Sequence, residues 1–265
     1  MRVLIVDDSS VFRTQIRRAL TDVPGIDIAG TASNGRIALQ MLEQKPVDLV
    51  TLDLNMPDMG GLDTLRAIRK AGRKIHVIVF ASRSARSAEE TIDALSNGAD
   101  DFVLKPDGTT LSLDHALEQV RSELVKRVKQ FAGGPKGANS EKSRTQSPPQ
   151  RSANFVTTAA GDQTSKAKIR HNLFQFKPMI IVIASSTGGP SALEAVLTKI
   201  PKPIRVPILI AQHMPATFTK FLAKRLQDCT GIACREAING EPIKSDTIYL
   251  APGDFHMRVG PSPRG

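Results

Sequence analysis

Short apolar runs alternate with stretches of helical apolar spacing throughout the first 130 residues of the chain. The runs hold few charged side chains, which is typical of strands buried on both faces of a parallel sheet. Five such units in a row predict an α/β fold with a five-stranded, doubly wound parallel sheet. The predicted strands are 2–6, 26–32, 47–52, 75–81 and 99–104, and the predicted helices are about 11–22, 35–45, 61–72, 86–97 and 111–131.

A second α/β pattern occupies residues 179–265 and begins with the apolar run MIIVIA. It predicts a Rossmann-like arrangement of strands and helices. The stretch is shorter than the roughly 100–150 residues of a typical domain, so we expect an incomplete domain with exposed apolar surface and low solubility, or dependence on a partner. The predicted strands are 179–184, 206–211, 232–237 and 246–251, and the predicted helices are about 190–199 and 216–228.

Residues 131–178, between these two patterns, are rich in Gly, Ser, Thr, Pro, Gln and Lys. Such a segment buries too little apolar surface to offset the entropy of ordering, so it is predicted to be a flexible linker. The net charge of +10 lies mainly in this linker, because residues 1–130 hold as many acidic as basic side chains. A basic tether could contact nucleic acid, lipid or an acidic protein, or it could simply be solvated.

Composition narrows the class of protein. Aromatic residues make up 4% of the chain and Trp is absent, which disfavours a stacking platform for single-stranded nucleic acid. The two cysteines, Cys229 and Cys234, are too few for a disulfide framework or a zinc site and are interpreted as reduced thiols. The N-terminus lacks the apolar segment of a signal peptide, and no apolar run is long enough to span a membrane. We therefore expect a cytoplasmic protein.

Four charged residues lie directly beyond predicted strands of the N-terminal sheet. Asp7 and Asp8 follow the first strand, Asp53 follows the third, and Lys105 follows the fifth. With strand order 2-1-3-4-5, the three carboxylates meet at the carboxyl edge of the sheet. Clustered carboxylates suit Mg²⁺, and a carboxylate beside Mg²⁺ and a lysine can accept a phosphoryl group. The alternative is that each aspartate only caps a helix or a turn.

A second candidate site combines Ser186 with His213. Ser186 lies in a turn between the strand 179–184 and the following helix, where Gly188 and Gly189 allow close backbone approach and the helix N-terminus offers N–H donors. His213 follows the next strand, so the two side chains share one sheet edge if these strands are neighbours. The alternatives are a capped turn, a weak phosphate cradle and an ordinary hydrogen-bonded histidine.

The segments VLIVDDS, VTLDLNMPDMGGLDTL and DDFVLKP resemble the receiver domain of two-component response regulators, over about residues 1–130. The resemblance implies that Asp53 accepts the phosphoryl group and that Lys105, joined to Pro106 by a cis bond, binds it. A Ser or Thr is expected at the end of the fourth strand, where this chain has Ala81, with Ser82 as the substitute. The metal ligands implied for Mg²⁺ are Asp7, Asp8, Asp53 and the Asn55 backbone carbonyl.

The segments ASSTGGPSAL, ILIAQHMPATFT and IYLAPGDFHM resemble the catalytic domain of the chemotaxis protein-glutamate methylesterases of the CheB type. Receiver, linker and catalytic domain occur in that family in the same order. The resemblance implies a Ser186 nucleophile, a His213 base, Thr187 near the oxyanion and His256 near the site. It assigns 1–130 to the receiver domain, 131–178 to the linker and 179–265 to the N-terminal part of the methylesterase domain.

The implied function is phosphorylation-regulated hydrolysis of glutamyl methyl esters, and deamidation of glutamines, on the cytoplasmic helices of chemoreceptors. The implied partners are a chemotaxis histidine kinase and the methylated receptors, so the protein would meet the membrane only through receptors. Mg²⁺ would serve phosphorylation, and ester hydrolysis would need no cofactor.

The sequence departs from the family in one respect. The family's triad aspartate lies in a Gly-Met-Gly-x-Asp-Gly segment beyond the APGD motif, and this chain has no such segment. Asp254 is the remaining candidate for an acidic partner, although an aspartate after a glycine more often forms a turn. We therefore expect doubtful catalysis from this chain, because loss of the acidic partner can cost about 10⁴ in rate.

Two other functions remain open. The chain is a catalytically inactive signalling module that accepts phosphate on Asp53, or it is a DNA-binding response regulator, as its net charge suggests. The second is disfavoured because the charge is spread through a linker and no helix-turn-helix pattern follows it. We therefore expect no nucleic-acid partner.

Overall fold

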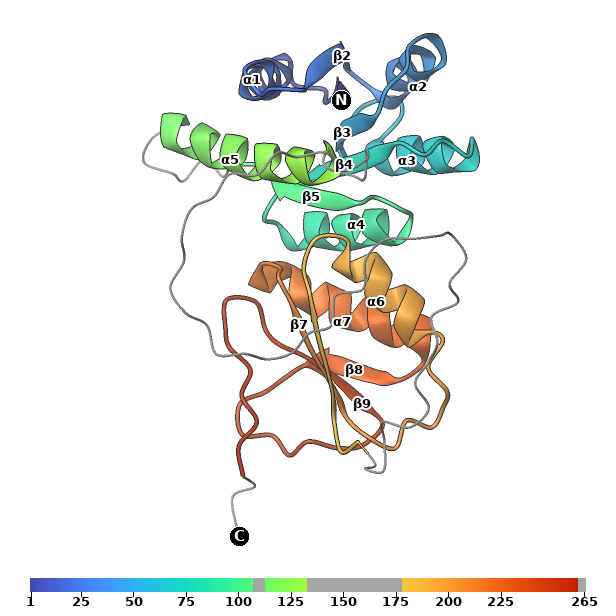
Figure 1. Cartoon of the computed structure of the whole chain (residues 1–265), viewed down its shortest axis with the longest axis vertical. Helices are drawn as coiled ribbons and strands as arrows, with labels where there is room; N and C mark the ends of the chain where they lie inside the picture. Colours follow the sequence, from blue (N-terminus) through green and yellow to red (C-terminus); the bar gives the residue numbers. More distant parts are fainter. Residues whose placement is uncertain (107–112, 133–177, 262–265) are drawn as a thin grey trace, which may run out of the picture. The chain divides into compact units, whose positions relative to one another are not determined.

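A computed structural model of the chain describes residues 1–106, 113–132 and 178–261 (Figure 1). Two parallel sheets form within this described part. The N-terminal sheet has five strands in the order β2-β1-β3-β4-β5, and the C-terminal sheet has four in the order β6-β7-β9-β8. The described residues of the two halves form one compact unit. The expected linker lies almost wholly outside the described residues, so the predicted domain boundaries stay predictions.

The N-terminal half follows the predicted alternation of strands and helices, with shifts of one or two residues at most ends. Its strands are buried in the middle of the sheet, and only β2, at one edge, is largely accessible. The strands are β1 (Arg2–Val6), β2 (Asp27–Ala32), β3 (Leu49–Asp53), β4 (His76–Ala81) and β5 (Asp101–Leu104). The helices are α1 (Ser10–Thr21), α2 (Gly35–Gln44), α3 (Gly61–Lys70), α4 (Ala85–Ser96) and α5 (Leu113–Ala132).

Alternating side chains of the central strands build two cores, one on each face of this sheet. On one face, β1 contributes Val3 and Ile5, which pack with apolar residues of α1 and α5 such as Leu20 and Leu124. On the other face, Leu4 and Val6 of β1 join residues of α2, α3 and α4. The doubly wound parallel fold predicted from the apolar runs is confirmed, and the sheet has the strand order 2-1-3-4-5 that the convergence of the carboxylates required.

The C-terminal sheet is also parallel throughout, as predicted. Helices α6 and α7 pack against each other and against α4 of the N-terminal half. Its strands are β6 (Ile181–Ser185), β7 (Ile208–Gln212), β8 (Ala233–Glu236) and β9 (Thr247–Leu250), and its helices are α6 (Gly189–Leu197) and α7 (Ala216–Thr230).

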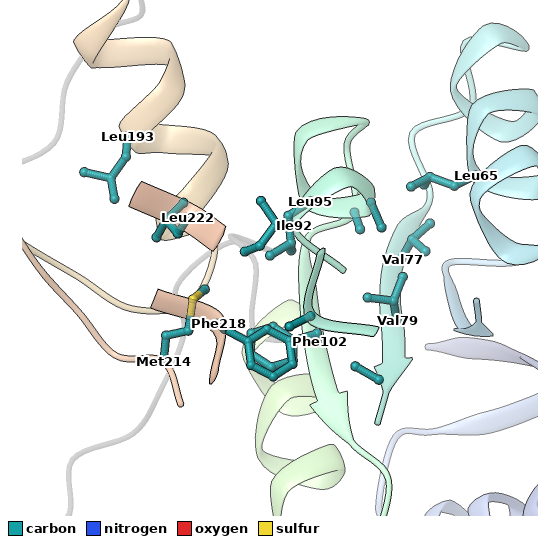
Figure 2. Packing of buried hydrophobic residues seen from close by; sticks show 14 of the residues in the cluster. Leu65, Val77, Val79, Ile92, Leu95, Phe102, Leu193, Met214, Phe218 and Leu222 are labelled. Atoms are coloured by element: carbon teal, nitrogen blue, oxygen red, sulfur yellow. The ribbon is translucent and has the colours of Figure 1, made fainter. Parts of the chain in front are cut away.

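One apolar cluster continues from the N-terminal sheet into the C-terminal half (Figure 2). Ile92 and Leu95 of α4 approach residues of α6 and α7, and the ring of Phe102 on β5 stacks on Phe218 of α7 with centroids 4.9 Å apart. The Ser191 hydroxyl of α6 donates to the Leu95 carbonyl at 2.9 Å. These contacts fix the start of α6, which follows the Ser186 turn, against α4.

The two cysteines are free thiols. Burial raises the pKa of Cys234 to about 12, so its thiol stays protonated and unreactive near neutral pH. Burial also raises the pKa of Cys229. Both side chains therefore act as small apolar groups in the C-terminal half.

Candidate functional site

The N-terminal site forms where β1, β3 and β5 end. Strands β1 and β3 pair directly, so Asp7 and Asp8, after β1, lie beside Asp53, the last residue of β3. Carboxylate oxygens of the three residues all lie within 4.8 Å of one another. Asp7 is fully buried, Asp53 is 4% exposed and Asp8 is exposed. The structure thus brings together the three carboxylates singled out from the sequence.

Lys105 directly follows β5, and its side chain extends to this cluster of carboxylates. Its Nζ lies 2.9 Å from Oδ2 of Asp7 and 2.7 Å from Oδ2 of Asp53. Burial raises the pKa of Asp53, and the hydrogen bond and charge of Lys105 offset this only in part. Burial lowers the pKa of Lys105, but its bonds to Asp53 and Asp7 outweigh burial and leave that pKa above its ordinary value.

The three carboxylates fit a hard divalent cation. Two buried oxygen donors and one exposed donor leave the outer side open to water and to phosphate oxygens, which is the arrangement that Mg²⁺ accepts. The N-cap of α1 is Ser9, and neither Asp7 nor Asp8 has that role; the Ser9 hydroxyl accepts from the Phe12 amide at 3.3 Å. The backbone N–H of Asn55 donates to Asp53 Oδ1 at 3.4 Å. The expected role of the Asn55 backbone carbonyl as a metal ligand stays a prediction.

Two expectations around this site concern the ends of β4 and β5. Ala81 is the buried last residue of β4, and the Ser82 hydroxyl is hydrogen-bonded to the Ser84 hydroxyl at 3.1 Å, so a phosphate-sensing role for Ser82 stays a prediction.

The expected cis bond between Lys105 and Pro106 is wrong. Within the described residues the cis peptide bond lies at Lys202–Pro203. Lys105 reaches both carboxylates from a trans peptide, the isomer that X–Pro bonds favour by about 0.5–1 kcal/mol.

We expect Asp53→Asn to stabilise the chain at pH 7 in the absence of divalent cations. A raised pKa means that ionisation of Asp53 costs more free energy in the folded state than in the unfolded state. This destabilisation is absent below the unfolded pKa of about 3.8 and grows as pH rises above it. The gain should therefore shrink towards zero near pH 4. Urea unfolding with EDTA at both pH values measures it. Asp58→Asn, an exposed aspartate nearby, is the control, and a loss of stability in Asp53→Asn at pH 7 would contradict the argument.

The second site forms at the ends of two neighbouring strands of the C-terminal sheet. β6 and β7 are parallel, with Ser185 paired to Gln212, so the next residues, Ser186 and His213, leave the sheet at the same edge. Ser186 Oγ lies 3.4 Å from Nδ1 of His213, and both residues are exposed. The structure thus brings this pair together, because β6 and β7 are adjacent.

The turn after Ser186 leads directly into α6. Gly188 has φ +69°, a left-handed conformation that glycine adopts without steric cost, and it is the N-cap of the helix. The Gly189 amide donates to the Ser186 carbonyl at 2.8 Å, and Pro190 occupies the first turn. The hydroxyl of Thr187 donates to Gln130 of α5 at 3.1 Å. Ser186 thus sits at the N-terminus of a helix, where backbone donors favour developing negative charge.

A cavity of about 750 Å³ opens beside the Ser186–His213 pair. Its lining includes Asp254 and His256 of the APGDFHM segment, both exposed. Among the side chains that the structure describes, no carboxylate is hydrogen-bonded to the His213 ring, whose partner is Ser186 Oγ. Asp254 has φ +65°, as expected for a turn-forming aspartate, and its suggested role as the acidic partner of His213 stays a prediction.

The segment that carries Asp254 is held by a buried hydroxyl that sequence reasoning did not single out. Thr219 on α7 is fully buried, and its Oγ1 accepts from the Gly253 amide at 3.2 Å. The same Oγ1 lies 2.5 Å from Oε1 of Glu236. A Cβ on Gly253 would lie 2.3 Å from the Ala216 backbone nitrogen, which explains glycine at that position.

Gln212 is the other residue beside the site that sequence reasoning did not single out. It precedes His213 in the chain, is 8% exposed, and directs its side-chain amide at the backbone of both site residues. The apolar run of β7 gave no signal for this role, because it depends on the neighbouring turn.

Comparison with known proteins covers both halves. Residues 3–115 match the response regulator receiver domain family, and residues 181–264 match the CheB methylesterase family. A protein-glutamate methylesterase/protein-glutamine glutaminase of Nocardioides sp. is 38% identical over 98% of this chain and 67% of its own length. The protein of the same name from Oceanobacillus iheyensis is 38% identical over 98% of this chain and 68% of its own length. This chain spans about two thirds of both relatives.

Among solved structures, the response regulator domain of Thermotoga maritima CheB is similar to the N-terminal half. It is 36% identical, with a TM-score of 0.44, and the match covers 51% of this chain and 98% of that domain. None of the helices that the structure describes is both long enough and apolar enough to cross a membrane.

Proposed function

Because this chain belongs to the family of protein-glutamate methylesterases/protein-glutamine glutaminases, we propose that it hydrolyses glutamyl methyl esters and deamidates glutamines on chemoreceptors, under control of phosphorylation at Asp53. In this proposal residues 1–130 receive the phosphoryl group, 131–178 link the halves, and 179–265 carry the ester chemistry. The implied partners are a chemotaxis histidine kinase and the methylated helices of chemoreceptors in the cytoplasm, with no nucleic acid involved.

The observation that carries the hydrolytic part is the 3.4 Å approach of Ser186 Oγ to His213 Nδ1 beside an open cavity. Ser186 Oγ bonds to the ester carbonyl carbon while its proton passes to Nδ1 of neutral His213. The imidazolium then protonates the departing methoxide, which leaves as methanol. Water, deprotonated by His213, then attacks the acyl carbon. The bond from that carbon to Ser186 Oγ breaks, the imidazolium returns its proton to Oγ, and the glutamate side chain is released as a carboxylic acid that ionises. With a glutamine side chain, ammonia leaves in place of methanol.

The N-terminus of α6 supports this chemistry. The turn at Gly188 places Ser186 close to the start of α6, where the helix dipole favours an oxyanion. A donor aimed at such an oxyanion is worth roughly 3–4 kcal/mol in other hydrolases. No metal or organic cofactor is needed for these steps.

Phosphorylation uses the carboxylate cluster. Asp53 Oδ attacks the phosphorus of the donor, the bond to the donor's leaving group breaks, and an acyl phosphate forms. Lys105, which contacts Asp53 at 2.7 Å, offsets the charge on the incoming phosphoryl group. Asp7, Asp8 and Asp53 would hold Mg²⁺, which when bound supplies positive charge to the phosphoryl oxygens.

The test is methanol release from membranes that hold methylated chemoreceptors. We expect release by the full 265-residue chain that rises with a small phosphodonor and Mg²⁺ and that disappears in Ser186→Ala. Ser245→Ala, at an exposed serine of the same half, is the matched control. Absence of Ser186-dependent release from folded protein phosphorylated on Asp53 would contradict the esterase proposal and leave a phosphate-accepting signalling module.

A further inference from the structure

Gln212 ends β7 with its side chain turned inward beneath the two strand-end residues of the hydrolytic site. Its Nε2 donates to the Ser186 carbonyl at 2.9 Å and to the His213 carbonyl at 3.3 Å. Its Oε1 accepts from the Ser185 hydroxyl at 2.6 Å. A single buried amide therefore joins the backbone of the candidate nucleophile to the backbone of the candidate base.

The chemistry of the partners fixes how this amide is oriented. Carbonyl oxygens only accept hydrogen bonds, so the NH₂ group faces Ser186 and His213, and the oxygen faces the Ser185 hydroxyl. Both protons of the amide are used in this arrangement. Neither an isosteric carboxylate, which lacks the protons, nor an apolar side chain reproduces the link.

The start of α6 packs tightly on the same amide. A Cβ on Gly189 would lie 2.0 Å from Oε1 of Gln212, so the helix approaches the amide as closely as glycine allows. The Gly189 amide also donates to the Ser186 carbonyl, the same oxygen that accepts a hydrogen bond from Gln212. The Ser186 turn is thus held from two sides, by its own helix and by Gln212.

We infer that Gln212 is a positioning residue that sets the separation and orientation of Ser186 and His213 through their backbone carbonyls. This inference rests on the proposed function for its effect on rate. Gln212 acts through the backbone of the pair, so the predicted effect falls on kcat and leaves KM nearly constant. Displacement of reacting groups by about 1 Å can cost about 10²-fold in rate.

The central experiment compares Gln212→Met with Gln227→Met in the full chain. Gln227, on α7, accepts a hydrogen bond from the Cys234 amide at 3.1 Å, so the control also removes an amide hydrogen bond from the C-terminal half. The readout is the rate at which a fluorophosphonate modifies Ser186, corrected for folded fraction, together with kcat and KM for a small ester. For Gln212→Met we expect a 10- to 100-fold fall in kcat and in the rate of Ser186 modification, with KM nearly constant. For Gln227→Met we expect both rates to fall by less than twofold. Equal effects of the two variants would overturn the inference.

Two further variants separate positioning from general stability. Gln212→Glu restores a donor only when its carboxyl is protonated, so its activity relative to the parent chain should fall as pH rises. Gly189→Ala keeps Gln212 but pushes its amide away from the turn, so it should reproduce the kcat loss of Gln212→Met. A pH-independent ratio for Gln212→Glu, or full activity of Gly189→Ala, would count against positioning.

Failure of the proposed function is distinguishable from failure of this inference. If the parent chain and Ser186→Ala react equally with the fluorophosphonate, the hydrolytic proposal fails, and amide hydrogen exchange then tests Gln212. Gln212→Met should speed exchange at Gly189, which donates to the Ser186 carbonyl, and at His213, which donates to the Ser185 carbonyl at 3.0 Å. Unchanged exchange at both amides would refute the positioning role.

Discussion

Replacement of His213 by glutamine is expected to lower Ser186-dependent ester hydrolysis by at least about 10³-fold without unfolding the chain. The ring is exposed and contacts Ser186 Oγ through Nδ1, so its loss removes the proton acceptor but little packing. A glutamine side chain offers an amide of similar length that cannot take a proton at neutral pH. Hydrolysis of a small ester and thermal unfolding of both proteins measure the two parts of this expectation.

The control for this variant is His256→Gln, at an exposed histidine that lines the same cavity. This variant should lower the rate of ester hydrolysis by less than about tenfold. A proton acceptor must lie within hydrogen-bond distance of the hydroxyl that it deprotonates, and for Ser186 that acceptor is His213. If His256→Gln lost as much activity as His213→Gln, the base would have to be assigned to both histidines or to His256. Hydrolysis that persists in His213→Gln would remove the Ser–His mechanism.

Asp53→Asn is expected to abolish phosphoryl transfer to the chain from a small phosphodonor in the presence of Mg²⁺. The amide of asparagine is not a nucleophile towards phosphorus. Asp53 is the carboxylate of the cluster that lies at the end of β3 and contacts Lys105. Intact-mass spectrometry of the phosphorylated and control samples counts the phosphoryl groups. The parent chain should carry one, and the variant none.

Asp58→Asn provides the matched control for phosphorylation. Asp58 is exposed on the loop after β3, its φ is +63°, and asparagine tolerates this left-handed conformation well. We therefore expect this variant to accept phosphate at the parent's rate. Equal phosphorylation of Asp53→Asn and the parent would transfer the acceptor role to Asp7 or Asp8 and would end the proposed regulation through Asp53.

Several features of the fold and of both sites were predictable from the sequence. Buried strands of a doubly wound sheet are continuous apolar runs, so the pattern around Val3–Val6 and Leu49–Leu52 predicted parallel strands. Parallel strands end at one edge, so charged residues directly after them, such as Asp7 and Asp53, had to converge there. The approach of Ser186 to His213 was predictable only on the condition that β6 and β7 are neighbours, and the sheet fulfils that condition.

Details that depend on contacts between distant segments could not be predicted in this way. The sequence pattern does not decide which residue caps α1, and Ser9 does so while Asp7 is left to pair with Lys105. The peptide bond before Pro106 is trans, the isomer that X–Pro bonds favour, whereas the motif suggested a cis bond.

The sequence by itself determined the fold class of each half and the strand ends at which its chemistry lies, because these follow from periodicity and from the parallel topology. The tertiary structure alone decided how the groups at those ends are held. Gln212 shows the difference, since its neighbours in sequence form an ordinary buried strand, and its role exists only because the Ser186 turn and Gly189 close over its amide. Burial of Asp53, which raises its pKa, is likewise a product of packing by several elements around one carboxylate.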